Sequence, residues 1–190
     1  MGERVARLRI LARNIGPRIG AEHALSDRAA LLAKADLVTD MVGEFPELQG
    51  TMGRYYAQHD GEAPAVADAI AQHYWPRYAG DALPEGPVAQ AVALADKLET
   101  LAGLFGIGAQ PTGDKDPFGL RRAAIGVLRM LIEKRLALPL PGLLALECQA
   151  FTRVPATRPV PDDLAETLYD RLRGPVHEQG EAANHMRACP

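Results

Sequence analysis

The chain has 190 residues, enough for one hydrophobic core, and 47% of them are hydrophobic, which is ordinary for a folded domain. Its formal net charge of -3 does not draw it onto nucleic acid, so any RNA contact must come from a local basic patch. Its two cysteines, Cys148 and Cys189, are far apart, and no apolar run reaches the about 18 residues of a membrane span, so we expect a reduced, cytoplasmic protein without membrane contact.

Apolar residues recur at helical spacing along most of the chain, and no convincing period-two alternation occurs. The predicted fold class is therefore all-α. Ser26-Asp27 is the cap candidate of the second helix, and Asp116-Pro117 combines an acidic cap with a first-turn proline for the sixth. In chain order, the predicted helices cover residues 5–16, 26–43, 47–57, 64–74, 87–105 and 116–135.

Prolines interrupt the pattern beyond residue 136, so Leu143 to Cys148 is predicted to form only a turn or two of helix. A last amphipathic stretch follows at 162–172, and the polar tail after Gly174 is expected to be disordered. The predicted domains are a helical domain over residues 1–142 and a proline-rich connection, short helix and tail over 143–190.

Two long segments carry a family resemblance. Residues 94–122, LADKLETLAGLFGIGAQPTGDKDPFGLRR, and residues 39–50, TDMVGEFPELQG, closely resemble the beta subunit of bacterial heterotetrameric glycyl-tRNA synthetase, and the likeness runs from about Arg4 to about Gly142. That subunit is much longer, so the chain is expected to be a fragment or shortened form of it.

The resemblance implies a division of labour. In that family the alpha subunit binds ATP and glycine, and the beta subunit supplies tRNA recognition. The implied partners are tRNA(Gly), the alpha subunit and the remaining beta-subunit domains. No cofactor is expected in this chain, since ATP and Mg serve the holoenzyme. The implied role is to shape and contact tRNA as part of a ligase.

The resemblance also implies an HD-like helical bundle with a degenerate metal site. Leu31 to Leu37 resembles the helix that carries the His-Asp pair of HD phosphohydrolases, with Ala35 where histidine is expected. Asp96 then stands where the final aspartate of that superfamily lies. Asp36 and Asp96 would remain as remnants, and two carboxylates alone make a weak, non-selective site. No bound metal is therefore expected.

Other patterns leave alternatives open. The pair His59-Asp60 lies in a polar turn, yet an active metal-dependent phosphohydrolase would use it together with Asp36 and Asp96. Asp36, Asp40 and Glu44 are spaced to share one face of one helix, either as an acidic metal platform or as a solvated face, with Lys34 and Lys97 as candidate partners. Ser26 is the only serine and has no triad partner nearby in sequence, so no catalytic residue is predicted.

Three regions are candidates for RNA contact. Residues 106–115 lack the spacing of a phosphate-binding P-loop, but Lys115, Arg121 and Arg122 surround a helix start that suits a phosphate, unless the arginines pair with Asp114 or Asp116. The aromatic segment 72–81 could stack on bases or cover a core. The third region is a basic set of five arginines, either an RNA patch or a solvated or docked helix: Arg4, Arg7, Arg9, Arg13 and Arg18. A helical protein-interaction module without an RNA role is a further alternative.

Overall fold

The computed structural model describes residues 2–78, 80–107 and 118–153, and every regular element within these ranges is helical. This confirms the all-α class. The helices, including three short 3-10 helices, are α1 (Gly2–Ile15), η1 (Gly16–Ile19), α2 (His23–Leu32), η2 (Ala35–Val38), α3 (Asp40–Glu44), η3 (Pro46–Leu48), α4 (Thr51–His59), α5 (Pro64–Gln72), α6 (Pro87–Gly106), α7 (Leu120–Glu133) and α8 (Leu140–Arg153). None of these described helices is long and apolar enough to cross a membrane.

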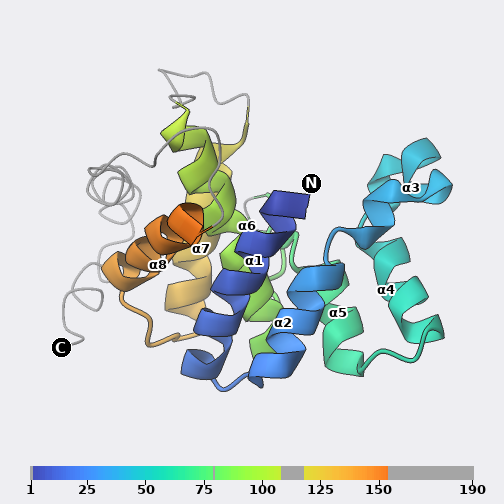
Figure 1. Ribbon diagram of the computed structural model, residues 1–190, viewed down its shortest axis with the longest axis horizontal. Helices are drawn as coiled ribbons and strands as arrows, with labels where there is room; N and C mark the ends of the chain where they lie inside the picture. Colours follow the sequence, from blue (N-terminus) through green and yellow to red (C-terminus); the bar gives the residue numbers. More distant parts are fainter. Residues whose placement is uncertain (1, 79, 108–117, 154–190) are drawn as a thin grey trace. The chain divides into compact units, whose positions relative to one another are not determined.

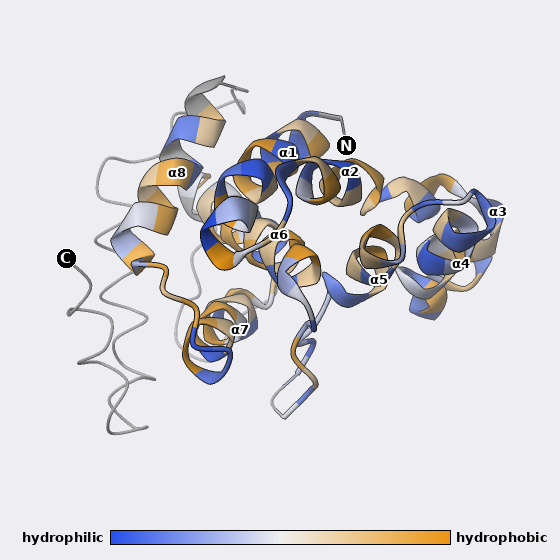
Figure 2. Ribbon diagram, turned by 90° about the horizontal axis from the view of Figure 1, so that it is seen from below, coloured by the Kyte–Doolittle hydropathy of each residue, from blue (hydrophilic) through white to orange (hydrophobic). Residues whose placement is uncertain are grey.

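The chain divides into two compact units, residues 1–96 and 97–190. In the first unit α1 packs on α2, α2 on α5 and α5 on α4, and these helices follow one another side by side in Figure 1. Each helix contributes an apolar face, visible as orange against blue in Figure 2. The fully buried side chains that form this core include Leu8, Leu11, Ile15, Ala29, Ala30, Ala67 and Ile70.

Glycine allows two helices of this unit to approach closely. Gly53 of α4 faces α5, and a Cβ atom on Gly53 would lie 2.7 Å from Ile70 Cγ2 and 3.0 Å from Asp36 Oδ2. Any larger residue would push these neighbours apart, so the α4–α5 contact depends on the missing side chain.

In the second unit, the end of α6 contacts α8, since a Cβ atom on Gly103 would lie 3.5 Å from Phe151 Cζ. Its buried apolar residues in α6 include Leu98, Leu101 and Ala102. Fully or nearly fully buried positions in α7 and α8 complete this core: Leu120, Val127, Met130, Leu140, Leu143, Leu144 and Ala150.

The single helix predicted over residues 26–43 is wrong. The chain instead forms α2, η2 and α3, and Ser26 lies inside α2, where its hydroxyl donates to the Glu22 carbonyl oxygen at 3.0 Å. The break occurs at Thr39, whose hydroxyl donates to the Asp36 carbonyl oxygen at 2.7 Å and accepts from the Val42 amide at 3.4 Å. Thr39 therefore caps α3 and separates it from η2.

Other boundaries differ less. α5 and α6 start at the predicted prolines, Pro64 and Pro87, whereas α7 begins at Leu120 because Gly119, with φ of 66°, precedes it as the cap. The predicted start at Asp116-Pro117 falls outside the described residues. α8 is longer than the predicted turn or two, since Pro141 sits in its first turn and does not interrupt it. The predicted division between residues 142 and 143 stays a prediction.

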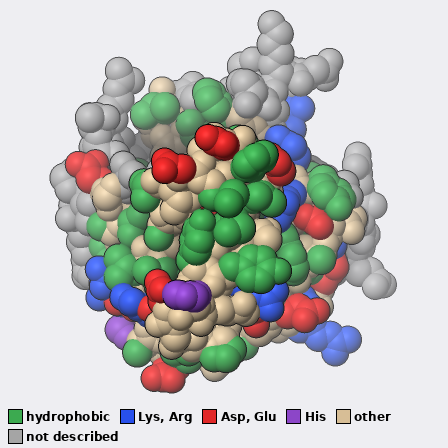
Figure 3. All heavy atoms as spheres, turned by 90° about the vertical axis from the view of Figure 1, so that its right-hand side faces the viewer, with side chains coloured by type: hydrophobic (Ala, Val, Ile, Leu, Met, Phe, Trp, Pro, Cys, Tyr) green, Lys and Arg blue, Asp and Glu red, His purple; other side chains and the backbone are tan. Residues whose placement is uncertain are grey.

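Exposed apolar side chains gather on one face of the first unit. Figure 3 looks at the end of the molecule that carries α3 and α4, and hydrophobic side chains occupy the middle of that view, with acidic side chains above them. The α3–α4 face, as we name it, consists of Val38, Met41, Phe45, Tyr55 and Tyr56.

The close approach at Gly53 generates a stability prediction. Gly53→Ala should lower the free energy of unfolding by about 1–3 kcal/mol, because overpacking against Ile70 and Asp36 outweighs the gain in helix propensity. The matched control is Gly43→Ala in α3, where an added Cβ meets nothing within 4 Å and the change should be neutral or stabilise by up to about 1 kcal/mol. Urea unfolding measures both, and equal effects would contradict the packing argument.

Candidate functional site

A buried cluster of charged side chains joins several elements of the first unit. Asp96 of α6 accepts a hydrogen bond from Arg4 of α1, at 3.1 Å between Arg4 Nη2 and Asp96 Oδ1. The other oxygen of Asp96 accepts from Lys34, which lies between α2 and η2, at 3.2 Å from Nζ to Oδ2. Lys34 and Asp96 are only 6% and 8% exposed. Because buried charges are tolerated when paired, the cluster holds these segments together.

The amine of Lys34 has the surroundings of an ammonium group. Nζ lies 2.7 Å from His73 Nε2 and 4.1 Å from the centre of the Tyr74 ring. His73 Nδ1 lies 2.7 Å from the Ile70 carbonyl oxygen, which can only accept, so Nδ1 carries the ring proton and Nε2 accepts from Lys34. A carboxylate, an imidazole lone pair and an aromatic face all favour a positive nitrogen here.

Burial and charge oppose each other in this cluster. Burial alone would raise the pKa of Asp96, but the positive charge around it, above all that of Lys34, outweighs burial and lowers that pKa to about 2. Burial lowers the pKa of the Lys34 amine, and the carboxylates of Asp96 and Asp36 offset only part of this effect. Nζ contacts the Asp96 carboxylate, the His73 ring nitrogen and the Tyr74 ring, and all three contacts favour the ammonium form. Lys34 is therefore the counter-ion of the Asp96 carboxylate.

Asp36 is also buried, and it anchors backbone. Its Oδ2 atom accepts hydrogen bonds from the amides of Gly50, at 2.6 Å, and Gly53, at 3.2 Å, which fixes the start of α4 against η2. Of the two residues predicted to be remnants of a metal site, Asp96 thus pairs with Lys34 and Asp36 holds backbone amides. Within the described ranges, no group of three or more His, Cys, Asp or Glu is placed to hold a metal ion.

The other two metal-type patterns are not assembled. The predicted row along one helix face is wrong, because the break at Thr39 leaves Asp36 buried in η2 and places Asp40 and Glu44, both exposed, on α3. His59 and Asp60 lie at the exposed end of α4, with side chains 89% and 73% accessible, and contact each other at 3.3 Å. This agrees with the interpretation of that pair as a solvated turn.

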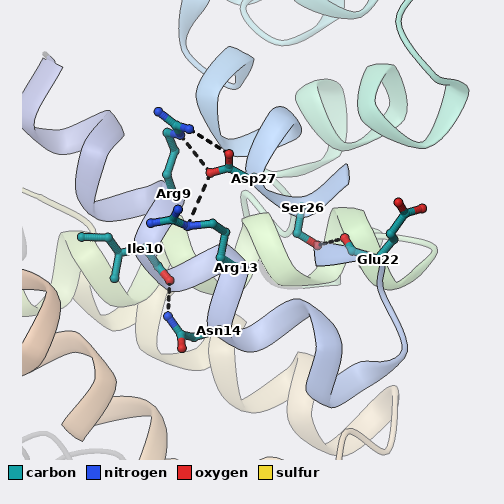
Figure 4. Close-up of polar contacts among 7 residues, drawn as sticks. All are labelled: Arg9, Ile10, Arg13, Asn14, Glu22, Ser26 and Asp27. Atoms are coloured by element: carbon teal, nitrogen blue, oxygen red, sulfur yellow. Dashed lines mark hydrogen bonds and ion pairs between the residues drawn. The ribbon is translucent and has the colours of Figure 1, made fainter. Parts of the chain in front are cut away.

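The arginines of α1 are largely engaged within the protein. Arg9 donates two hydrogen bonds to the Asp27 carboxylate of α2, at 2.9 Å and 2.8 Å, and Arg13 Nε lies 3.6 Å from the same carboxylate (Figure 4). The hydrogen bond from Arg9 holds the pKa of Asp27 below its usual range. Arg7 is buried and Arg4 contacts Asp96. These contacts favour a helix docked by its arginines over an RNA patch.

The aromatic segment 72–81 turns partly inward. His73 is fully buried, and its ring centre lies 3.9 Å from that of Tyr74. Among the described aromatic and basic residues of this segment, only Arg77 and Tyr78 are exposed. His73 was not predicted to be a partner of Lys34. The helical spacing of Val66, Ile70 and His73, the last of which caps α5, indicates that His73 is buried but does not indicate its partner.

The start of α7 presents two exposed arginines, Arg121 and Arg122. The first turn of this helix contains no acidic residue. The Arg122 guanidinium lies against the cap, since a Cβ on Gly119 would be 2.8 Å from Arg122 Nη2. Lys115, the third predicted RNA-binding residue, lies outside the described residues, as do Asp114 and Asp116.

The whole chain, residues 1–190, matches the aminoacyl-tRNA synthetase family described as glycyl-tRNA synthetase beta subunit. The chain belongs to that family.

Its relatives carry the same name. Proteins named "Glycine--tRNA ligase beta subunit" from Ralstonia nicotianae, Dechloromonas aromatica and Paracidovorax citrulli are 57%, 58% and 59% identical to it over 186, 191 and 189 residues. Each match covers 98% of this chain but only 26% or 27% of the relative. The chain therefore spans about a quarter of the length of these proteins.

The lowered pKa of Asp96 predicts how stability depends on pH. The folded-state pKa of about 2 lies below the unfolded value of about 3.9, so the stabilisation is present above pH 4 and is lost as the pH falls toward 2. Its full size is about 2–3 kcal/mol. Urea unfolding at pH 4.5 and 2.5 should show a loss for the wild type that exceeds that of Asp96→Asn by about 1.5 kcal/mol, since part of Asp96 is still ionised at pH 2.5. An equal loss in both proteins would contradict the charge pairing.

Proposed function

We propose that this chain is the part of a glycyl-tRNA synthetase beta subunit that shapes and contacts tRNA(Gly), and that bond formation takes place elsewhere in the enzyme. The family match over residues 1–190 carries this proposal. Because the chain spans about a quarter of its relatives, glycylation would need the rest of the beta subunit and an alpha subunit that binds ATP, Mg and glycine. The proposed site of action is the cytoplasm, and this chain would need no cofactor of its own.

The proposed RNA contact lies at the start of α7 and involves Lys115, Arg121 and Arg122. Two exposed guanidinium groups beside a helix amino terminus suit a phosphate, since charge and helix dipole act in the same direction. The α1 arginines are weaker candidates, because Arg9 and Arg13 already share the Asp27 carboxylate.

The proposed scaffold of the first unit is an HD-like bundle whose metal site has degenerated. Ala35 stands where a histidine ligand is expected, and the ammonium of Lys34 lies beside Asp96 in the position of a counter-ion. An internal ammonium would neutralise the carboxylate charge without offering a Lewis acid or a metal-bound water. The cluster would then serve stability and not hydrolysis.

The RNA proposal is tested in the complete beta subunit assembled with the alpha subunit. Arg121→Ala combined with Arg122→Ala should weaken tRNA binding for all sequences and reduce the slope of log K against log salt by about 1.4–1.8, at about 0.7–0.9 per phosphate contact. The matched control is Arg129→Ala on the same helix, where the arginine already contacts Glu133 at 2.7 Å and the slope should not change. If the double variant has a lowered melting temperature and an unchanged slope, Arg121 and Arg122 stabilise the fold and do not contact RNA.

The degenerate metal site has its own test. Mn²⁺ at 1 mM should not raise the melting temperature of the chain, and bis(p-nitrophenyl) phosphate should not be hydrolysed. A site with a Kd of about 10 µM would stabilise the protein by about 2.7 kcal/mol at this concentration, a shift of several degrees. Such a shift together with hydrolysis would favour the phosphohydrolase alternative.

A further inference from the structure

Exposed large apolar side chains are concentrated on the α3–α4 face. Of nine exposed large apolar side chains in the described residues, five belong to this face, which occupies only residues 38–56. Val38 is 83% exposed, Tyr55 61% and Phe45 46%. η2 contacts both α3 and α4, and hydrophobic side chains lie together in the middle of the view onto this end of the first unit (Figure 3). A contiguous apolar surface of this kind marks a contact site more often than scattered residues do.

The charges around this face select the kind of partner. Residues 38–56 include three exposed acidic side chains, Asp40, Glu44 and Glu47. The only basic residue among them is Arg54, which contacts Asp68 at 2.9 Å. Figure 3 shows acidic side chains above the apolar ones. Acidic side chains on one side of an apolar surface repel RNA phosphates, and they fit a protein surface on which lysine or arginine lies beside apolar side chains.

We propose that the α3–α4 face is covered by another domain of the full-length beta subunit that presents such a surface. The inference rests on family membership and is independent of the tRNA contact at α7. The relatives extend well beyond this chain, since each match covers only 26% or 27% of their length, so about three quarters of the polypeptide lies elsewhere.

The size of the face favours this occupant over a separate protein. Five apolar side chains are far fewer than the about 20–30 residues that each partner contributes to a stable interface between proteins. A domain in the same polypeptide needs less contact area, because tethering gives it an effective concentration in the millimolar range.

The test measures thiol labelling in the full-length beta subunit, without alpha subunit or tRNA. Tyr55→Cys and Val38→Cys place a thiol on the face, and Tyr78→Cys is the matched control, since Tyr78 is a tyrosine with an equal exposure of 62% outside it. Mass spectrometry of the labelled peptides separates these sites from Cys148 and Cys189. Both face variants should react with a maleimide at least tenfold more slowly than Tyr78→Cys.

The remaining outcomes each overturn the proposal. Labelling of the face variants at a rate close to that of Tyr78→Cys would show an open surface. Slowing that appears only after the alpha subunit is added would assign the face to that subunit, and slowing that needs tRNA would assign it to RNA. Slowing that increases with protein concentration would assign it to a second copy of the chain.

Discussion

The pairing of Asp96 with Lys34 is the constraint on which the first unit depends. An isolated carboxylate or ammonium in this position would cost several kcal/mol to bury, so neither residue is tolerated there without the other. Arg4 and His73 complete the set of contacts, and together these residues bring α1, the α2–η2 junction, the end of α5 and α6 to one point. Asp36 extends the same region to α4 through its bonds to backbone amides.

This arrangement separates the interior of the first unit from the surfaces on which we expect function. A hydrolytic metal site needs carboxylates and imidazoles that are open to an ion and to water, whereas Asp96 and His73 are buried and contact an ammonium group. Two arginines of α1 likewise form ion pairs within the protein, Arg9 with Asp27 and Arg4 with Asp96. The arginines at the start of α7 and the apolar α3–α4 face remain exposed, and they differ in charge, so they suit different partners.

Helical periodicity predicted the all-α class and the start of α5 and α6, because proline and the apolar spacing act locally. It failed between residues 26 and 43, since the hydrogen bonds of the Thr39 side chain outweighed a continuous apolar pattern. Lys34 was recognised as a partner for acidic residues, but its choice of Asp96 and His73 depends on contacts between residues 62 and 39 positions apart, which no local pattern contains. The family was predicted from long motifs and is confirmed by the match over the whole chain.

A double-mutant cycle on Lys34 and Asp96 tests the central claim most directly. The variants Lys34→Met, Asp96→Asn and their combination are compared with the wild type by urea unfolding at pH 7. Asp96→Asn leaves the Lys34 ammonium without its hydrogen-bonded carboxylate, and Lys34→Met leaves Asp96 with Arg4 as its remaining cation. Each single change should cost up to about 3–5 kcal/mol, whereas the double change should cost less than the sum by about 2 kcal/mol or more. Additive effects within about 0.5 kcal/mol would contradict a buried ion pair that organises the first unit.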